Sequence, residues 1–238
     1  MSKIQRKFVV PGDLVVKGDF EPVANAYRDA DAVYALKVGL SEIEGDKVRI
    51  IPLAGRYIPR IDDPVVGIVT DVNAFAWTVE INSFFPAFIT ASDVFGKRFS
   101  PERDDLTRMF NMGDVVLARV AAFDRFKDPM LSVAGPRLGA IRGGQLVKVS
   151  PVKVPRLIGR RGAMTKMIED STGTRITIGQ NGYTVITGPP DKMLVASQAI
   201  ELVETDAHMA GLTETVQAFL TKSMGRNAVI PEPDYDGE

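Results

Sequence analysis

The feature that most constrains this chain is a pair of glycines three residues apart, Gly159-Arg160-Arg161-Gly162, set between two apolar patterns. An apolar pair at 157–158 precedes it, and Met164, Met167 and Ile168 follow at helical spacing. Glycines have no Cβ, so two helical segments can meet closely there. The free N–H groups at the start of the second segment then face outward, where they attract phosphate. The stretch predicts a corner between two helices that binds an anion.

The charge around this corner has one sign. From residue 129 to residue 168 there is no Asp or Glu, but there are eight Lys and Arg, although the net charge of the 238-residue chain is only −1. A solvated surface normally mixes both signs, so a one-sign block of this length favours a nucleic acid as partner. The candidate contacts beside the two glycines and the two arginines of the turn are Lys153, Arg156 and Lys166.

Composition excludes most catalytic designs. The chain has no Cys and one His, His208, so a disulfide, a cysteine zinc site and a histidine-rich metal site are excluded. A Ser–His–Asp triad would have to use His208, which follows a helical pattern near the C-terminus and is interpreted as a surface or structural residue. We expect no catalytic residue, no metal and no cofactor.

The chain lacks the marks of export or membrane insertion. Charges or prolines interrupt every apolar run before it reaches spanning length. The N-terminal residues lack the apolar core of a secretory signal. A cytoplasmic protein without membrane contact is expected.

Turn residues divide the chain into several domains, and the elements between them predict a multi-domain α+β protein. Residues 1–60 read as short strands with tight Pro, Gly and Asp turns, and predict a small all-β domain. Residues 61–136 predict five strands with a long connection after the third, which matches an OB-type barrel. Residues 144–205 follow the order β-α-α-β-β-α, and residues 206–238 are an acidic tail with one further helix.

Aromatic residues concentrate in the predicted barrel. It holds nine of the twelve Phe and the only Trp. Most must fill the core, although aromatics on a barrel face also stack nucleic-acid bases, at about 1–3 kcal/mol per base. Trp77 and Phe88 are candidate base contacts, with core packing favoured for Trp77 because its alternating neighbours are apolar. Arg125 and Lys127 flank Phe126 in a predicted loop and are further candidates.

The third domain resembles a type I KH domain from Gly144 to about Glu204, since its glycine turn lies between the first two helices. KH domains clamp about four nucleotides against this loop. The barrel resembles an S1 domain in V-G-I-V-T-D-V, W-T-V-E-I, A-F-I-T-A-S, G-D-V-V-L-A-R-V and M-L-S-V. It departs from the S1 pattern at Thr90, where a His commonly stands, and at Ala74 and Ala76, around the usual Gly-aromatic turn.

The whole chain is similar to the ribosomal RNA-processing protein 4 family of archaea. The resemblance includes V-V-P-G-D near the start and G-R-Y-I-P-R-I-D-D-P-V-V-G before the barrel. It implies a non-catalytic RNA-binding cap of the exosome, with three copies on a hexameric phosphorolytic ring and S1 domains around the pore. It also implies that the chain captures single-stranded RNA and guides it to the 3'-to-5' exoribonuclease ring. The N-terminal domain would dock on the ring.

Two other functions stay open. One is a free-standing S1/KH factor that acts in translation or as an RNA chaperone, and that binds RNA but no ring. The other is a hydrolase that uses Asp62-Asp63 or Asp104-Asp105 with a divalent metal. Adjacent acids on a strand point to opposite faces, so neither pair makes a good chelate by itself.

Overall fold

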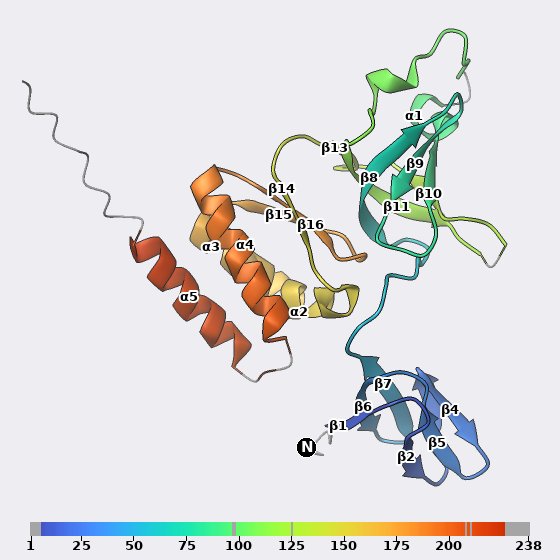
Figure 1. The fold of residues 1–238 in the computed structure, drawn as a ribbon, viewed down its shortest axis with the longest axis vertical. Helices are drawn as coiled ribbons and strands as arrows, with labels where there is room; N and C mark the ends of the chain where they lie inside the picture. The colour runs from blue at the N-terminus through green and yellow to red at the C-terminus, as the bar shows by residue number, and fades with distance from the viewer. Residues whose placement is uncertain (1–5, 97–98, 125, 208, 210, 227–238) are drawn as a thin grey trace, which may run out of the picture. The chain divides into compact units, whose positions relative to one another are not determined.

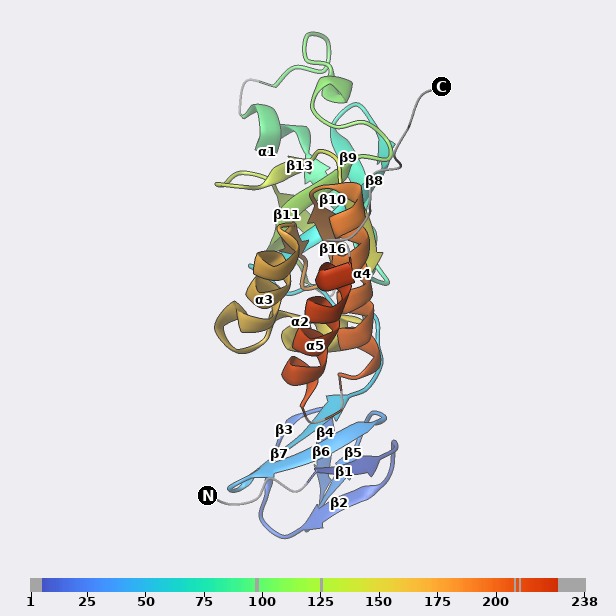
Figure 2. The same cartoon turned by 90° about the vertical axis from the view of Figure 1, so that its left-hand side faces the viewer.

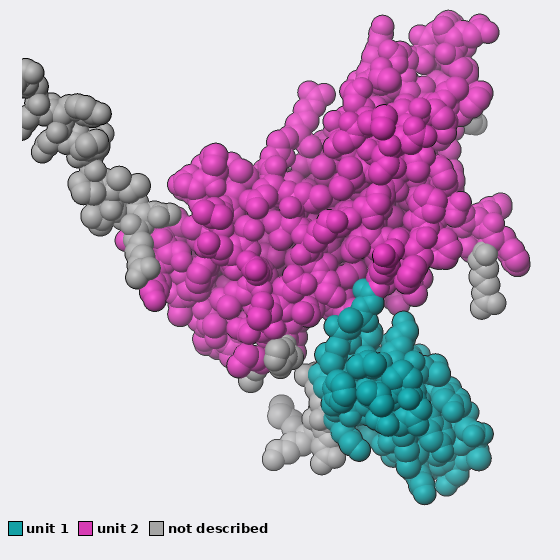
Figure 3. Space-filling model, in the orientation of Figure 1, with its two compact units in different colours: residues 1–55 teal, residues 56–238 magenta. Residues whose placement is uncertain are grey.

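The structure is a computed structural model that describes residues 6–96, 99–124, 126–207, 209 and 211–226. His208 and the end of the acidic tail, residues 227–238, lie outside this part. The chain contains two compact units, Met1–Gly55 and Arg56–Glu238 (Figure 3). Residues 56–60, which the sequence analysis assigns to the first domain, belong to the second unit. The predicted multi-domain α+β fold is confirmed.

The first unit consists of short strands separated by tight turns, as its turn-forming Pro, Gly and Asp residues predict. Two sheets have the strand orders β1-β6-β7-β3 and β2-β5-β4. Val9, Ala35 and Ile50 form the small buried core. The strands are β1 (Arg6–Val9), β2 (Leu14–Lys17), β3 (Glu21–Ala24), β4 (Ala26–Asp29), β5 (Ala32–Ala35), β6 (Gly39–Glu44) and β7 (Lys47–Pro52).

The second unit begins with a closed barrel. Strand β12 pairs in parallel with β10 and antiparallel with β11, which closes the sheet. Buried and half-buried residues alternate along β9 and β10, as inward and outward faces of a barrel strand require. The elements are β8 (Pro64–Val72), β9 (Ala76–Glu80), β10 (Ala87–Thr90), α1 (Ala91–Phe95), η1 (Leu106–Arg108), β11 (Val115–Ala122), β12 (Met130–Ser132) and β13 (Gly139–Ile141).

Strand β13 was not expected from the sequence. It pairs with β11 and adds a sixth strand to the sheet, in the order β12-β10-β9-β8-β11-β13. Three residues, one of them glycine, are too few to give an alternating pattern. The pairing with a long neighbouring strand, rather than local preference, therefore makes this segment a strand.

A three-stranded sheet with helices on one face follows the barrel (Figure 1 and Figure 2). Its strand order is β14-β16-β15, all antiparallel. Leu157, Ile168 and Ile200 are wholly buried between the helices and the sheet. The elements are β14 (Gln145–Lys148), η2 (Pro151–Lys153), α2 (Val154–Ile158), η3 (Arg160–Gly162), α3 (Ala163–Thr172), β15 (Arg175–Ile178), β16 (Tyr183–Thr187), α4 (Pro190–Thr205) and α5 (Leu212–Arg226).

The other face of this sheet packs against the barrel. Tyr183 and Val185 of β16 form one buried cluster with Val66 of β8. The Tyr183 hydroxyl donates to the Glu80 carboxylate at 2.5 Å, and the Lys148 ammonium lies 5.1 Å from the centre of the Tyr183 ring. Burial first, and then the hydrogen bond to Glu80, raises the pKa of Tyr183 above its ordinary value. The barrel and the KH sheet thus share a buried contact.

The turn between β15 and β16, Gly179–Gly182, completes this contact. Asn181 is fully buried, and its Nδ2 donates to the carbonyl oxygens of Val66 at 2.6 Å and Ile81 at 2.9 Å. Its Oδ1 accepts from the N–H of Val66 at 3.2 Å. The amide therefore satisfies both backbone groups of Val66, as a neighbouring strand would.

Candidate nucleic-acid interface

The Gly159–Gly162 turn lies between α2 and α3, as the sequence predicts. Helix α2 ends at Gly159, with φ 73° and ψ −179°, a conformation that is essentially restricted to glycine. Gly162 precedes α3 with φ 80° and ψ 10°. Arg161 between them has φ 54° and ψ 31°, which is unusual for a residue with a side chain. The backbone is thus held in an uncommon shape where a functional site is expected.

Buried residues on both sides anchor the turn. Leu157 and Met164 lie in the helical core, and the Thr165 hydroxyl donates to the Leu157 carbonyl oxygen at 2.9 Å. A Cβ on Gly159 would lie 2.8 Å from both the backbone N and the Cβ of Met164. Helix α3 begins without a side-chain cap at Gly162. The N–H of Ala163, its first residue, donates to the Arg160 carbonyl oxygen.

The cations predicted to surround the turn are accessible. Arg156, Arg160, Arg161 and Lys166 are exposed, and Lys153 is half-buried. Within the part of the chain that the structure describes, none of these five forms an ion pair. The arrangement is a positive surface beside the N-terminus of α3, which suits a phosphodiester backbone.

Two acids of this domain are engaged by backbone amides. The Glu169 carboxylate accepts from the N–H of Ile176 at 2.7 Å. The Glu204 carboxylate accepts from the N–H of Ser150 at 3.1 Å. These hydrogen bonds hold the two carboxylates in the KH fold, and in the described part of the chain neither forms an ion pair with a cation of the turn.

Trp77 is not available as a base contact, which corrects its place among the candidates. It is fully buried in the barrel, and its Nε1 donates to the carbonyl oxygen of Phe110 at 3.0 Å. Its ring meets Phe110 edge-on at 5.2 Å and stacks on Phe95 at 6.4 Å between ring centroids. The alternation along β9 turns this position inward, so the indole fills the core.

The other barrel candidates lie at or near the surface. Phe88 is half-buried on the outward face of β10, directly opposite Thr78 of β9. Lys127 is exposed in the connection between β11 and β12. Arg125 lies outside the described residues. Phe88 and Lys127 therefore stay as candidate contacts.

Phe75 is a further exposed aromatic residue of the barrel, with an exposed fraction of 65%, and the sequence alone did not single it out. The Asn73 side-chain oxygen accepts from the N–H groups of Phe75 and Ala76, both at 2.9 Å. The Phe75 carbonyl oxygen accepts from the N–H of Ala91 at 2.8 Å. Asn73 was the available signal, because its side chain replaces the glycine usually expected in such a turn.

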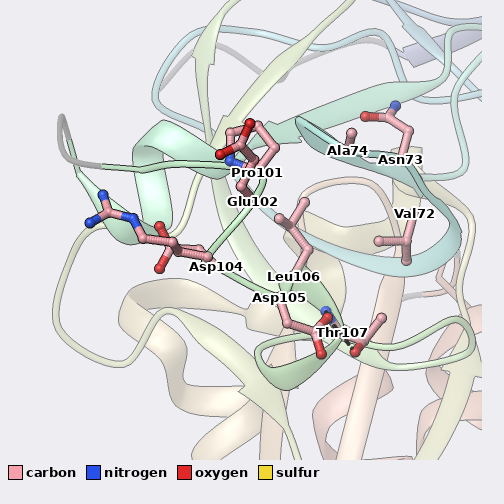
Figure 4. Close-up of a pocket in the computed structure, with 10 residues that line it drawn as sticks. Val72, Asn73, Ala74, Pro101, Glu102, Asp104, Asp105, Leu106 and Thr107 are labelled. Carbon is pink, nitrogen blue, oxygen red and sulfur yellow. Dashed lines mark hydrogen bonds between the residues drawn. The ribbon is translucent and has the colours of Figure 1, made fainter.

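The paired acids are occupied in local structure. A pocket of about 380 Å³ is lined by Asp104 and Asp105 (Figure 4). Asp105 accepts from the hydroxyl and the N–H of Thr107, at 2.7 and 3.0 Å, and these bonds lower its pKa. Asp104 accepts from the N–H of Ser100 at 2.8 Å. Both carboxylates therefore serve as caps of turns.

The second acid pair is also engaged. Asp63 accepts from the hydroxyl of Tyr57 at 2.7 Å, and Asp62 lies 3.8 Å from a guanidinium nitrogen of Arg119. Among the described residues, no three His, Cys, Asp or Glu are grouped so that they could hold a metal ion. No helix of that part is long and apolar enough to cross a bilayer.

Fold and site together define a class of protein, a multi-domain nucleic-acid-binding protein that joins an OB-type barrel to a KH domain. Residues 6–54 match the family described as "Exosome RNA binding protein RRP4 N-terminal domain", and residues 145–202 match the KH domain family. The chain is 44% identical to the exosome complex component Rrp4 of Nitrosopumilus maritimus, over 92% of this chain and 97% of that protein. The chain belongs to the Rrp4 family of exosome components.

A second relative and a solved structure support the same family. The exosome complex component Rrp4 of Thermococcus kodakarensis is 39% identical, over 98% of this chain and 93% of that protein. A crystal structure described as a putative exosome complex RNA-binding protein is 34% identical, with a TM-score of 0.69 over 73% of this chain and 99% of that one.

Proposed function

We propose that this chain is a non-catalytic RNA-binding cap subunit of an archaeal exosome. It captures single-stranded RNA and guides it to the pore of a phosphorolytic 3'-to-5' exoribonuclease ring, for RNA degradation and processing. The observation that carries this proposal is the exposed Gly159–Gly162 turn in a member of the Rrp4 family, with cations around it that form no ion pair in the part of the chain that the structure describes. A cytoplasmic location is part of the proposal.

The turn binds RNA in two ways, by letting the RNA backbone approach the protein backbone closely and by its positive charge. Gly159 and Gly162 carry no side chain between the RNA backbone and the start of α3. Arg160 and Arg161 lie where phosphates approach, and charge-assisted hydrogen bonds from guanidinium groups to phosphate are among the stronger ones in water. Lys153, Arg156 and Lys166 widen the positive surface along α2 and α3. These contacts recognise the backbone and leave the scissile bond untouched.

The N-terminal unit is proposed to dock on the ring. It exposes several large apolar side chains for a domain of this size, and such exposure marks interaction surfaces. Three copies on a hexameric ring would place the cap around the pore. The exposed apolar residues of this unit are Phe8, Val10, Leu14, Val23, Tyr27, Leu36 and Val38.

The test is charge reversal at the turn, with Arg160→Asp and Arg161→Asp combined. Affinity for single-stranded RNA, measured by fluorescence anisotropy at moderate salt, should fall at least tenfold, while the far-UV circular dichroism spectrum is unchanged because both side chains are exposed. The matched control reverses Lys17 and Lys47, which are exposed in the first unit. Equal affinity of the turn variant and the wild type would contradict the proposal.

Salt dependence and partners give independent tests. The logarithm of the affinity should fall linearly with the logarithm of salt concentration, by about 0.7 per neutralised phosphate of a single strand. A flat profile would exclude electrostatic capture. Co-purification with a hexameric phosphorolytic ring distinguishes the cap from a free-standing S1/KH factor, which binds RNA alone.

A further inference from the structure

The C-terminal segment, residues 227–238, carries charges in a regular pattern that the proposed function does not use. It contains no Lys, Arg or His. An acid occupies every second position from 232 to 238, and alternate residues of an extended chain lie on one side, about 6.7 Å apart. Such a chain presents a row of evenly spaced negative charges, as a polynucleotide strand does. The four acids are Glu232, Asp234, Asp236 and Glu238.

The surface beside the Gly159–Gly162 turn offers the opposite charge. Its five cations form no ion pair in the part of the chain that the structure describes. No Asp or Glu occurs from residue 129 to residue 168, although the net charge of the whole chain is only −1. Two separate blocks of opposite charge attract each other, so a contact between them lowers the electrostatic energy of the chain.

Helix α5 brings the acidic segment to the domain that holds the turn. It lies beside α3 (Figure 1 and Figure 2), and Leu220 of α5 shares a buried cluster with Met164 in the first turn of α3. Met224, two residues before the end of α5, packs against the same cluster. The segment therefore follows directly on a helix that is packed into the KH domain.

The segment is long enough to reach the turn. Its twelve residues span up to about 40 Å when extended. Helix α3, with 10 residues, is about 15 Å long, and α5, with 15 residues, is about 22 Å long. The reach of the segment exceeds the lengths of the two helices together, so the distance from Arg226 to the turn does not prevent the contact.

We infer that residues 227–238 bind the cationic surface of the Gly159–Gly162 turn in the same chain and compete there with single-stranded RNA. The inference rests on the proposed function, because RNA is the ligand that the segment displaces. Tethering gives the segment a high effective concentration at the turn, which offsets the weakness of each surface ion pair. RNA that covers more cations than the segment does should displace it, whereas short oligonucleotides compete poorly.

The first experiment detects the contact in the absence of RNA. The chain has no Cys, so Gly237→Cys provides a single site for a nitroxide spin label. At low salt the label should broaden the amide NMR signals of residues 156–166 in the full chain. Added oligouridylate, or salt at about 0.5 M, should restore these signals, because both remove the electrostatic contact.

A variant without the four acids is the control for this contact. In it the same spin label should leave the signals of residues 156–166 sharp, because the segment keeps its length and loses its charge. The substitutions of this neutralised variant are Glu232→Gln, Asp234→Asn, Asp236→Asn and Glu238→Gln.

The second experiment measures competition with RNA. The neutralised variant should bind a short oligouridylate about three- to tenfold more tightly than the wild type at low salt, as expected if the turn is free in about a third to a tenth of wild-type molecules. The gain should shrink as salt rises, because screening weakens the contact. It should disappear when Arg160→Asp and Arg161→Asp are added.

The matched control removes four exposed acids from the first unit, so that it has the same net charge as the neutralised variant. Its affinity for the oligouridylate should stay within about twofold of the wild type, because these acids are not expected to contact the turn. A gain equal to that of the neutralised variant would show a general effect of net charge and would overturn the inference. The control substitutions are Glu21→Gln, Asp29→Asn, Asp31→Asn and Asp46→Asn.

The outcomes distinguish the inference from the proposed function. Sharp signals for residues 156–166 and an unchanged affinity in the neutralised variant, with loss of RNA binding in the Arg160 and Arg161 reversal, would overturn the inference and leave the function standing. Broadening confined to the first unit would also overturn it. If the reversal abolishes the broadening but leaves the RNA affinity unchanged, competition with RNA and the proposed function both fail.

Discussion

Two turns of the KH domain have the same glycine spacing and opposite surroundings. The turn Gly159–Gly162 is exposed, carries two arginines and forms no ion pair among the described residues. The turn Gly179–Gly182 carries Gln180 and Asn181 and enters the barrel wall. The residues between the glycines decide the difference: two guanidinium groups cannot be buried without partners, whereas one amide can match backbone donors and acceptors.

The glycines also serve the two turns differently. In the exposed turn Gly162 permits only a backbone conformation, since a Cβ there would meet nothing within 4 Å, whereas Gly159 also permits the close approach of Met164. In the buried turn they permit close approach, since a Cβ on Gly179 would lie 2.6 Å from the backbone nitrogen of Val66. Glycine spacing alone therefore does not identify a nucleic-acid loop. The charge and the burial of the residues between the two glycines identify such a loop.

The largest expected effect is on the buried turn. Asn181→Ala leaves the N–H and C=O of Val66 and the C=O of Ile81 without their partner. We expect a loss of about 3–5 kcal/mol in the free energy of unfolding, measured with urea. Gln180→Ala is the control, with less than about 0.5 kcal/mol expected because its contact is made by the backbone. Equal stability of the two variants would show that the turns do not differ as described.

The exposed turn should respond unequally to substitutions of its two glycines. Gly159→Ala forces a side chain into a glycine-only conformation and within 2.8 Å of Met164, so we expect a loss of about 2–3 kcal/mol. Gly162→Ala meets open space and should cost about 1 kcal/mol. Thermal unfolding of both variants tests the ranking. A reversed ranking would contradict the geometry of the turn.

The smallest effect concerns Tyr183, which follows the buried turn. Its folded-state pKa is raised above the value of about 10 for an unfolded tyrosine, so its contribution to stability is complete below about pH 10. The contribution decreases as the pH rises beyond that value. The difference in unfolding free energy between wild type and Tyr183→Phe should therefore decline by about 1 kcal/mol or less between pH 9 and pH 10.5. A difference that is constant with pH would contradict the shift.

Local pattern was enough to predict the architecture and the exposed turn. Alternation in β9 and β10, the helices beside Gly159–Gly162, and Gly173 as the end of α3 all reflect short-range preferences. The alternation of residues from Gln145 to Val154 predicts one strand over this range, but the strand ends at Lys148, since Pro151 starts a 3-10 turn before α2.

Features that depend on contacts between distant segments were not predictable. The pair Asn181-Gly182 predicts a hairpin turn, but the role of Asn181 depends on Val66, 115 residues earlier in the chain. The sequence leaves two roles possible for Trp77, a base contact and a core residue, and its hydrogen bond to the Phe110 carbonyl oxygen shows that it belongs to the core. Exposure of the Phe84 and Phe126 rings likewise follows from the closed barrel, because a composition-based argument assigns most aromatics to a core.

The hydrogen bonds of the buried Asn181 amide to the barrel backbone have a consequence for the avidity of RNA binding. Because the Asn181 amide binds the KH sheet to β8, the two domains hold their proposed RNA surfaces at a set separation, without the freedom of a linker. A strand held at one surface then meets the second at a high effective concentration. Affinity should rise steeply once an oligonucleotide is long enough to span both, and change little with length on either side of that threshold.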